Sequence, residues 1–189
     1  MDSLLKIVNF LGKRLDEPFT LLEISRETGV PYATLHRTVG ENADLFVAKR
    51  VGKARTLALN RRKPTIRSYL AISSEEEKKA FLKRQPIIAI IASDLDTTEI
   101  VLLFGSYAKG TQRERSDIDI IVINKEGKRT LSFSKYELLY DKQINPLFFT
   151  KTEFKAMLRD EEENVGKQAL QGHIVLNNPE AFWECVLHG

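Results

Sequence analysis

One segment near the middle of the chain constrains both its fold and its chemistry. Residues 101–123 contain an apolar run, then Gly105 and Ser106, ten further residues, and Asp117 and Asp119 at the start of a second apolar run. Short apolar runs bounded by turn-forming residues indicate buried β-strands. The segment therefore joins a turn suited to phosphate to a carboxylate pair suited to a metal ion.

The glycine turn has the features of a phosphate site. A strand over residues 100–104 is followed by helical residues 106–109, and Gly110 ends them. Gly105 has no Cβ, so the backbone can approach a ligand closely, and the free amides of a helix start donate to negative oxygen. We expect Gly105 and Ser106 to bind phosphate oxygens.

The two aspartates are spaced for one face of a strand. Side chains alternate along a strand, so Asp117 and Asp119 point to one side while Ile118 and Ile120 point to the core. Adjacent carboxylates repel each other unless a cation lies between them, and magnesium accepts such oxygen ligands together with phosphates and water. A purely structural role as a turn cap would leave the distance to Gly105 unexplained.

Composition limits the other classes of site. The 189 residues are 42% hydrophobic and include a single cysteine, Cys185, and three scattered histidines, His36, His173 and His188. A single cysteine cannot form an internal disulfide, and the histidines do not have the spacing of a zinc site. A bound metal would therefore have oxygen ligands. There is no apolar run of about 18 residues and no signal peptide pattern, so we expect a cytoplasmic protein without membrane contact.

Charge is distributed unevenly along the chain. Residues 1–63 hold 12 Lys and Arg against 7 Asp and Glu, giving +5, while residues 64–189 have a net charge of −2. Periodic apolar residues predict helices over residues 2–15, 20–28 and 31–39, the second and third ending at Gly29 and Gly40. Residues 45–51 and 54–60 read as a hairpin. This order, over residues 1–62, resembles a winged helix-turn-helix domain.

The resemblance implies that the helix over residues 31–39 enters the major groove of duplex DNA and that the hairpin holds phosphates. The candidate contacts are Tyr32, Thr34, His36 and Arg37 on the helix and Lys49, Arg50, Lys53 and Arg55 on the hairpin. The alternative is a protein-docking or dimerising module with a solvated basic face. Salt-dependent DNA binding would separate the two hypotheses, because phosphate contacts release counterions.

A helical linker is expected over residues 63–85, with a capping box at Ser73 that starts a helix ending near Arg84. Residues 86–95 fit either a helix or a buried strand. Later in the chain we expect a helix capped by Thr152, an extended run at 173–176, and a last helix opened by Pro179 that places Trp183 in the core.

Residues 104–110 and 116–120 resemble the polymerase beta type nucleotidyltransferase superfamily, and most closely the minimal nucleotidyltransferases often found in prokaryotic toxin-antitoxin modules. The likeness spans about residues 86–188, and the predicted domain is 86–189. It implies an α+β protein in which a small mixed sheet is flanked by helices. It also implies transfer of a nucleoside monophosphate from a triphosphate, with ATP favoured, to a hydroxyl acceptor.

Carried onto this sequence, the resemblance assigns Gly105 and Ser106 to the triphosphate, and Asp117 and Asp119 to Mg²⁺ and catalysis. Ser116, directly before the aspartates, is a further candidate for nucleotide binding. Two further candidates for neutralising phosphate charge, from position and charge alone, are Lys109 and Arg113.

The sequence departs from the family pattern at one position. Catalytic members usually carry a third carboxylate on a later strand, and here the best-aligned residue of the strand over 143–149 is Asn145. An amide offers a metal its carbonyl oxygen but cannot act as a base. Glu137 and Asp141, on the preceding segment, are the available substitutes.

Two hypotheses therefore stay open. The first is an Mg²⁺-dependent nucleotidyltransferase with a DNA-binding domain and an unidentified acceptor, such as a toxin protein or an RNA. The second is a DNA-binding regulator or antitoxin whose second domain binds a nucleotide without transferring it. We assign no oligomeric state from the sequence.

Overall fold

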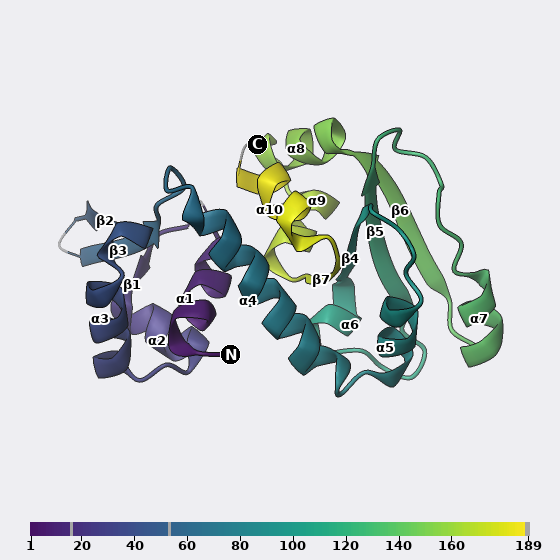
Figure 1. Cartoon of the computed structure of the whole chain (residues 1–189), viewed down its shortest axis with the longest axis horizontal. Helices are drawn as coiled ribbons and strands as arrows, with labels where there is room; N and C mark the ends of the chain where they lie inside the picture. Colours follow the sequence, from purple (N-terminus) through teal and green to yellow (C-terminus); the bar gives the residue numbers. More distant parts are fainter. Residues whose placement is uncertain (16, 53, 188–189) are drawn as a thin grey trace. The chain divides into compact units, whose positions relative to one another are not determined.

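The computed structural model describes residues 1–15, 17–52 and 54–187. Contacts divide the chain into two compact units, Met1–Glu76 and Glu77–Gly189, and the division falls inside the predicted linker (Figure 1). Lys53 and His188 lie outside the described residues. In the described part of the chain, no helix has both the length and the apolar character required to cross a bilayer.

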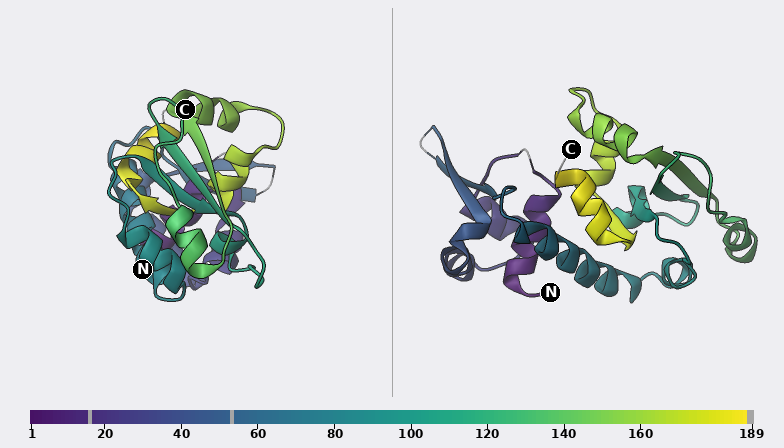
Figure 2. Two further views of the ribbon diagram at one scale, coloured as in Figure 1. Left: turned by 90° about the vertical axis from the view of Figure 1, so that its right-hand side faces the viewer. Right: turned by 45° about the horizontal axis from the view of Figure 1, so that its top comes forward.

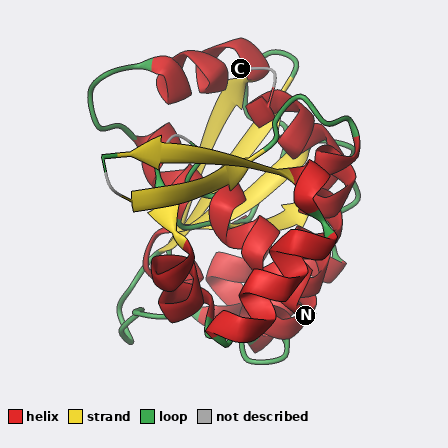
Figure 3. Cartoon of the chain, turned by 90° about the vertical axis from the view of Figure 1, so that its left-hand side faces the viewer, coloured by secondary structure: helices red, strands yellow, loops and turns green. Residues whose placement is uncertain are grey.

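Before the long helix that continues into the second unit, the described residues of the first unit combine three α-helices with a small antiparallel sheet. Its strands follow the order β1-β3-β2, and the β2–β3 pair forms the predicted hairpin (Figure 3). The bounds are α1 Ser3–Gly12, β1 Phe19–Thr20, α2 Leu21–Thr28, α3 Tyr32–Glu41, a 3-10 turn Ala43–Leu45, β2 Phe46–Val51 and β3 Ala54–Leu59.

Local hydrogen bonds explain where these helices begin and end. Thr20 and Glu23 form a reciprocal capping box at the start of α2, and Gly29 ends that helix with a φ of 67°. The predicted end of α3 at Gly40 is wrong. The helix continues to Glu41, and the Asn42 side-chain amide donates to the Thr38 carbonyl at 2.9 Å, which satisfies one of the terminal acceptors.

The linker is one continuous helix, α4, Thr65–Leu82. The expected start at Ser73 is therefore wrong. Ser73 is buried within the helix, and its hydroxyl donates to the Leu70 carbonyl at 2.8 Å. Because this bond satisfies the side chain inside the helix, Ser73 does not act as a cap.

The second unit contains the mixed sheet that the family resemblance implied (Figure 1). The strands follow the order β6-β5-β4-β7, in which β5 and β6 are parallel and the other pairs antiparallel. Their bounds are β4 Ile100–Phe104, β5 Ile118–Asn124, β6 Ile144–Thr150 and β7 Ile174–Asn177.

The described residues of this unit also form six shorter helices: α5 Pro86–Ser93, α6 Gly105–Lys109, α7 Ser134–Tyr140, α8 Lys151–Arg159, α9 Val165–Gln171 and α10 Pro179–Leu187. Residues 86–93 are helical because Ile88 and Ile91 share a buried face, whereas Ile90 is exposed. Thr150, not Thr152, caps α8. Helix α7 was not predicted.

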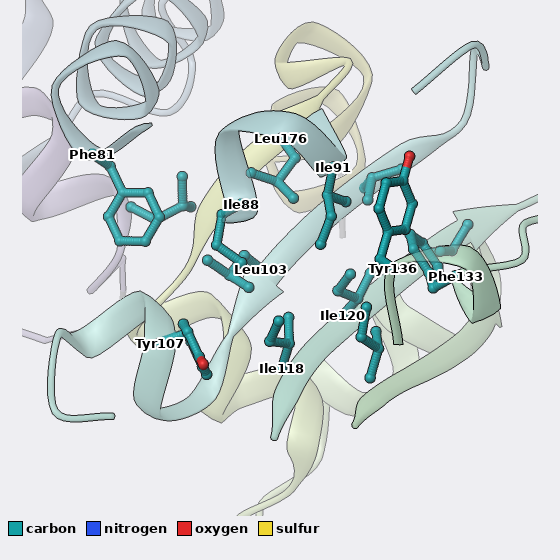
Figure 4. Close-up of a cluster of buried hydrophobic side chains, with 14 residues drawn as sticks. Phe81, Ile88, Ile91, Leu103, Tyr107, Ile118, Ile120, Phe133, Tyr136 and Leu176 are labelled. Carbon is teal, nitrogen blue, oxygen red and sulfur yellow. The ribbon is translucent and has the colours of Figure 1, made fainter. Parts of the chain in front are cut away.

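Apolar side chains fill both faces of the sheet. On one face Ile118 and Ile120 of β5 pack with Ile88 and Ile91 of α5 (Figure 4). On the other side α8, α9 and α10 contact the strands. Phe154, Phe182 and Trp183 are fully buried there, so the predicted core role of Trp183 is confirmed.

Candidate active site

The turn after β4 brings Gly105 against Asp119. Phe104 pairs with Asp119 across the β4–β5 ladder, and the chain then turns into α6 through Gly105 at a φ of 69°. A Cβ built on Gly105 would lie 2.2 Å from Asp119 Oδ2. The sequence suggested that the missing Cβ makes room for a ligand. The structure shows that glycine is first required to make room for the Asp119 carboxylate.

The two aspartates stand where β5 begins, on either side of the fully buried Ile118. Both are half-buried. Burial raises the pKa of Asp119 above its usual value, its hydrogen bond to Asn145 lowers it, and the negative charge of Asp117 raises it further. A cation between the two carboxylates would relieve both the burial cost and the repulsion, so the donor set fits Mg²⁺.

Asn145 completes the group from the neighbouring strand. It pairs with Asp119 in the parallel β5–β6 register, and its Nδ2 donates to Asp117 Oδ2 at 3.3 Å. Gln143 Nε2 donates to Asn145 Oδ1 at 3.0 Å. The predicted placement of Asn145 beside the aspartates is confirmed.

A third carboxylate is not supplied by either possible substitute. Among residues 1–15, 17–52 and 54–187, no cluster of three His, Cys, Asp or Glu side chains is arranged to hold a metal. Glu137 Oε1 accepts a hydrogen bond from the Ile144 amide at 3.0 Å and so holds the start of β6. Asp141 is exposed at the C-terminus of α7.

The other residues predicted to bind phosphate lie around α6 and the loop that follows it. The Ser106 hydroxyl is half-buried and has no hydrogen bond to the described residues, whereas Ser116 Oγ accepts from the Arg113 amide at 2.8 Å and stabilises the loop. Lys109 and Arg113 are exposed. A Cβ built on Gly172 would lie 3.1 Å from Lys109 Cε, so the lysine stem lies beside the end of α9.

A polar pocket of about 550 Å³ opens beside Asp117. Lys142 Nζ donates to the Glu114 carbonyl and ties the two walls together. The lining residues are Glu114, Arg115, Ser116, Asp117, Tyr140, Asp141, Lys142 and Gln143. Sequence reasoning missed Arg115, and it missed Tyr140, Lys142 and Gln143 because α7 was not recognised. The only signal was their closeness in sequence to Asp117 and Asn145.

In the first unit, most of the predicted DNA-contacting side chains are exposed. Tyr32, His36 and Arg37 on α3 are exposed, while Thr34 is half-buried. Arg37 Nε lies 3.9 Å from a Glu41 carboxylate oxygen.

The hairpin carries the other described candidates. Lys49, Arg50 and Arg55 are exposed, and Arg50 pairs directly with Arg55 across the two strands. A groove of about 620 Å³ lies between α3 and the hairpin, and Tyr32, His36 and Arg55 are among its lining residues. The structure thus brings residues of the helix and the hairpin around one groove.

Comparison with known proteins places the second unit. The family described as "Polymerase beta, Nucleotidyltransferase" matches residues 85–181. A relative from Methanocaldococcus jannaschii, named "Putative protein adenylyltransferase MJ0141", is 38% identical over 90 residues, which cover 44% of this chain and 87% of the relative. No solved structure matches the chain. The family match covers more than half of the sequence and includes Gly105, Asp117, Asp119 and Asn145. The chain belongs to the polymerase beta nucleotidyltransferase family.

Proposed function

We propose that the chain transfers AMP from ATP to a hydroxyl group of a protein, and that its first unit binds duplex DNA. The observation that carries the transfer is the arrangement of Gly105, Asp117 and Asp119 at one end of the sheet. Family membership supports nucleotidyl transfer, and the adenylyltransferase name of the relative supports ATP as donor and a protein as acceptor.

The proposed reaction is an in-line displacement. The acceptor hydroxyl oxygen bonds to the α-phosphorus, the bond from that phosphorus to the bridging oxygen of the β-phosphate breaks, and pyrophosphate leaves. The hydroxyl proton is released to water. The backbone amides at the start of α6 and the Ser106 hydroxyl bind the phosphates of the leaving group.

Asp117 and Asp119 would hold Mg²⁺, and the side-chain nitrogen of Asn145 donates to Asp117 from the neighbouring strand. When bound, the ion supplies positive charge that offsets the charge on the phosphates. The packing of Asp119 against Gly105 fixes one carboxylate, and the hydrogen bond from Asn145 orients the other. The exposed cations Lys109 and Arg113 are proposed to add charge at the triphosphate.

We propose that the first unit is a winged helix-turn-helix domain. Three helices, followed by an antiparallel hairpin with exposed arginines, have the order and the surface charge that this role requires. Tyr32, Thr34, His36 and Arg37 would face the major groove, and Lys49, Arg50 and Arg55 would contact phosphates. Lys53 lies outside the described residues, so its predicted contact with DNA phosphates stays a prediction.

A second function is favoured by one observation, the amide at position 145. Asn145 donates a hydrogen bond to Asp117 at the position where a third carboxylate would bind metal and assist removal of the hydroxyl proton. A domain of this kind could bind Mg²⁺ and ATP without transferring AMP. The chain would then be a nucleotide-responsive DNA-binding regulator.

Label transfer separates the two functions. The full chain is incubated with Mg²⁺ and each nucleoside triphosphate labelled on the α-phosphate, with unfolded casein or a mixed-sequence RNA as acceptor. We expect label from ATP on protein, lost in Asp119→Asn. Label on RNA alone would contradict the protein acceptor. Mg²⁺-dependent ATP binding without label on either acceptor would support the regulator.

A further inference from the structure

Helix α7 exposes an unusual pair of apolar side chains beside the active-site pocket. Leu138 and Leu139 are 88% and 68% exposed, the highest values among the large hydrophobic residues in the described part of the chain. Tyr136 on the same helix is buried in the core, so α7 is anchored to the second unit through this side chain. The leucines are therefore held on a packed helix and not on a loose loop.

The chain continues from these leucines directly into the pocket. Tyr140, Asp141, Lys142 and Gln143 follow Leu139 without a break, and all four line the pocket that contains Asp117. Figure 2 shows α7 at the edge of the second unit. The leucine pair thus directly precedes the pocket-lining residues in the chain, although neither leucine lines the pocket itself.

The geometry of the reaction decides what approaches from this side. In-line displacement places the acceptor opposite the leaving pyrophosphate. Gly105 and Ser106, proposed to hold the triphosphate, lie on the β4 side of β5, whereas Asn145 and the pocket lie on the β6 side. With the triphosphate at Gly105, the acceptor enters past α7.

We propose that Leu138 and Leu139 form the docking surface for the acceptor polypeptide, binding its apolar residues while its hydroxyl side chain enters the pocket beside Asp117. This inference rests on the proposed protein adenylyltransferase function. It adds a recognition preference: the hydroxyl residue of the acceptor is flanked by apolar side chains.

Side-chain chemistry and area both favour a polypeptide as the occupant. The pocket wall carries Glu114, Asp117 and Asp141 together with Arg115 and Lys142, so it is not a basic surface for a phosphodiester backbone, and leucines offer a nucleic acid no hydrogen bond. Two leucines expose far less than the roughly 800 Å² per partner of a stable interface, so a second copy of the chain is not the expected occupant. A small apolar contact suits a substrate that must leave after modification.

The test uses the full chain and two synthetic peptides of equal length and charge. Each carries one central tyrosine, flanked by leucines in one peptide and by serines in the other. AMP transfer from ATP labelled on the α-phosphate is measured for the wild type and for Leu138→Ser/Leu139→Ser. A control double variant, Leu22→Ser/Ile72→Ser, removes two other exposed aliphatic side chains, which are 51% and 52% exposed.

We expect the wild type and the control to have a KM for the leucine-flanked peptide about tenfold below that for the serine-flanked peptide, because apolar contact is gained on binding. The α7 variant should lose this preference while kcat and ATP binding stay unchanged. Its thermal unfolding should match that of the wild type, since both leucines are exposed.

Two outcomes would overturn the docking proposal alone: equal KM values for the two peptides in the wild type, or a preference kept by the α7 variant. No labelled peptide from a protein that binds ATP would overturn the proposed transfer as well and would favour the regulator. A wild-type dimer that the α7 variant converts to a monomer would assign the surface to a second copy. Failure of the wild type to bind ATP would overturn the proposed function as well.

Discussion

Gly105 and Asp119 are so close that one cannot change without displacing the other. A Cβ on Gly105 would lie 2.2 Å from Asp119 Oδ2 and 3.1 Å from Asp119 Cγ. The glycine of the Gly-Ser turn and the second aspartate of the Asp-x-Asp pair are therefore two parts of one packed contact. Their closeness follows from the pairing of Phe104, the residue before Gly105, with Asp119 across β4 and β5.

Gly105→Ala should abolish Mg²⁺-dependent ATP binding, because the new methyl group forces the Asp119 carboxylate out of place. Gly110→Ala is the matched control, since Gly110 has the same φ of 69° but no atom within 4 Å of the point where its Cβ would lie. Both variants should lose about 1 kcal/mol of stability from an alanine at positive φ. Calorimetry and thermal unfolding measure the two effects, and equal ATP binding by both variants would contradict the packing argument.

Asp119→Asn should stabilise the metal-free protein at neutral pH. Burial raises the pKa of Asp119 in the folded state, so the folded protein favours the protonated acid, and its stability falls as pH rises through that pKa. The variant's advantage in Tm over the wild type should therefore be present at pH 7 and shrink towards pH 4. Asp96→Asn, at an exposed position, is the control. A lower Tm for Asp119→Asn at pH 7 would argue against this view of the site.

Magnesium should stabilise the folded wild type far more than it stabilises the Asp119→Asn variant. Binding to the folded wild type stabilises it by about 2.7 kcal/mol at a concentration 100-fold above the Kd, whereas Asp119→Asn should gain little. Thermal unfolding with and without Mg²⁺ measures the difference. The same shift in both proteins would show that the ion binds elsewhere.

Asn145→Asp should tighten Mg²⁺ binding about tenfold, the result of roughly 1.4 kcal/mol of added charge attraction. The amide now donates to Asp117 at 3.3 Å, so the substitution exchanges this hydrogen bond for a third negative charge. In the absence of the ion the variant should be less stable at neutral pH. Faster AMP transfer by Asn145→Asp would show that the amide limits catalysis, and weaker Mg²⁺ binding would contradict the assigned position of residue 145.

Arg50→Ala/Arg55→Ala should weaken duplex DNA binding and reduce the slope of log K against log salt by about 2, since each phosphate contact contributes about 1. The control is Lys125→Ala/Arg129→Ala, which removes two exposed cations from the second unit. Fluorescence anisotropy across a salt series measures the DNA affinity and the salt slope of each variant. An unchanged slope in the hairpin variant would favour the protein-docking alternative for the first unit.

The sequence predicted the parts of the site that depend on strand geometry. The alternation of Asp117, Ile118 and Asp119 determined which side chains share a face, and the apolar runs around them located β4 and β5. The placement of Asn145 followed from the family resemblance and agrees with the β5–β6 register.

Contacts between distant residues were not predictable in the same way. The packing of Asp119 against Gly105 depends on the strand register, which the order of residues alone does not specify. Helix α7 has seven residues and two exposed leucines, so its apolar pattern gives no clear helical face. Ser73 resembles a cap, yet bonds within α4. The DNA, toxin and cytoplasmic assignments stay predictions.

The central claim is that Gly105, Asp117 and Asp119 form one Mg²⁺-dependent site for ATP. Isothermal titration of ATP into the full chain with Mg²⁺ tests it most directly, beside the same titration with EDTA and into Asp117→Asn/Asp119→Asn. We predict binding by the wild type with Mg²⁺ and none in the other two titrations. Equal ATP affinity in all three would contradict the claim.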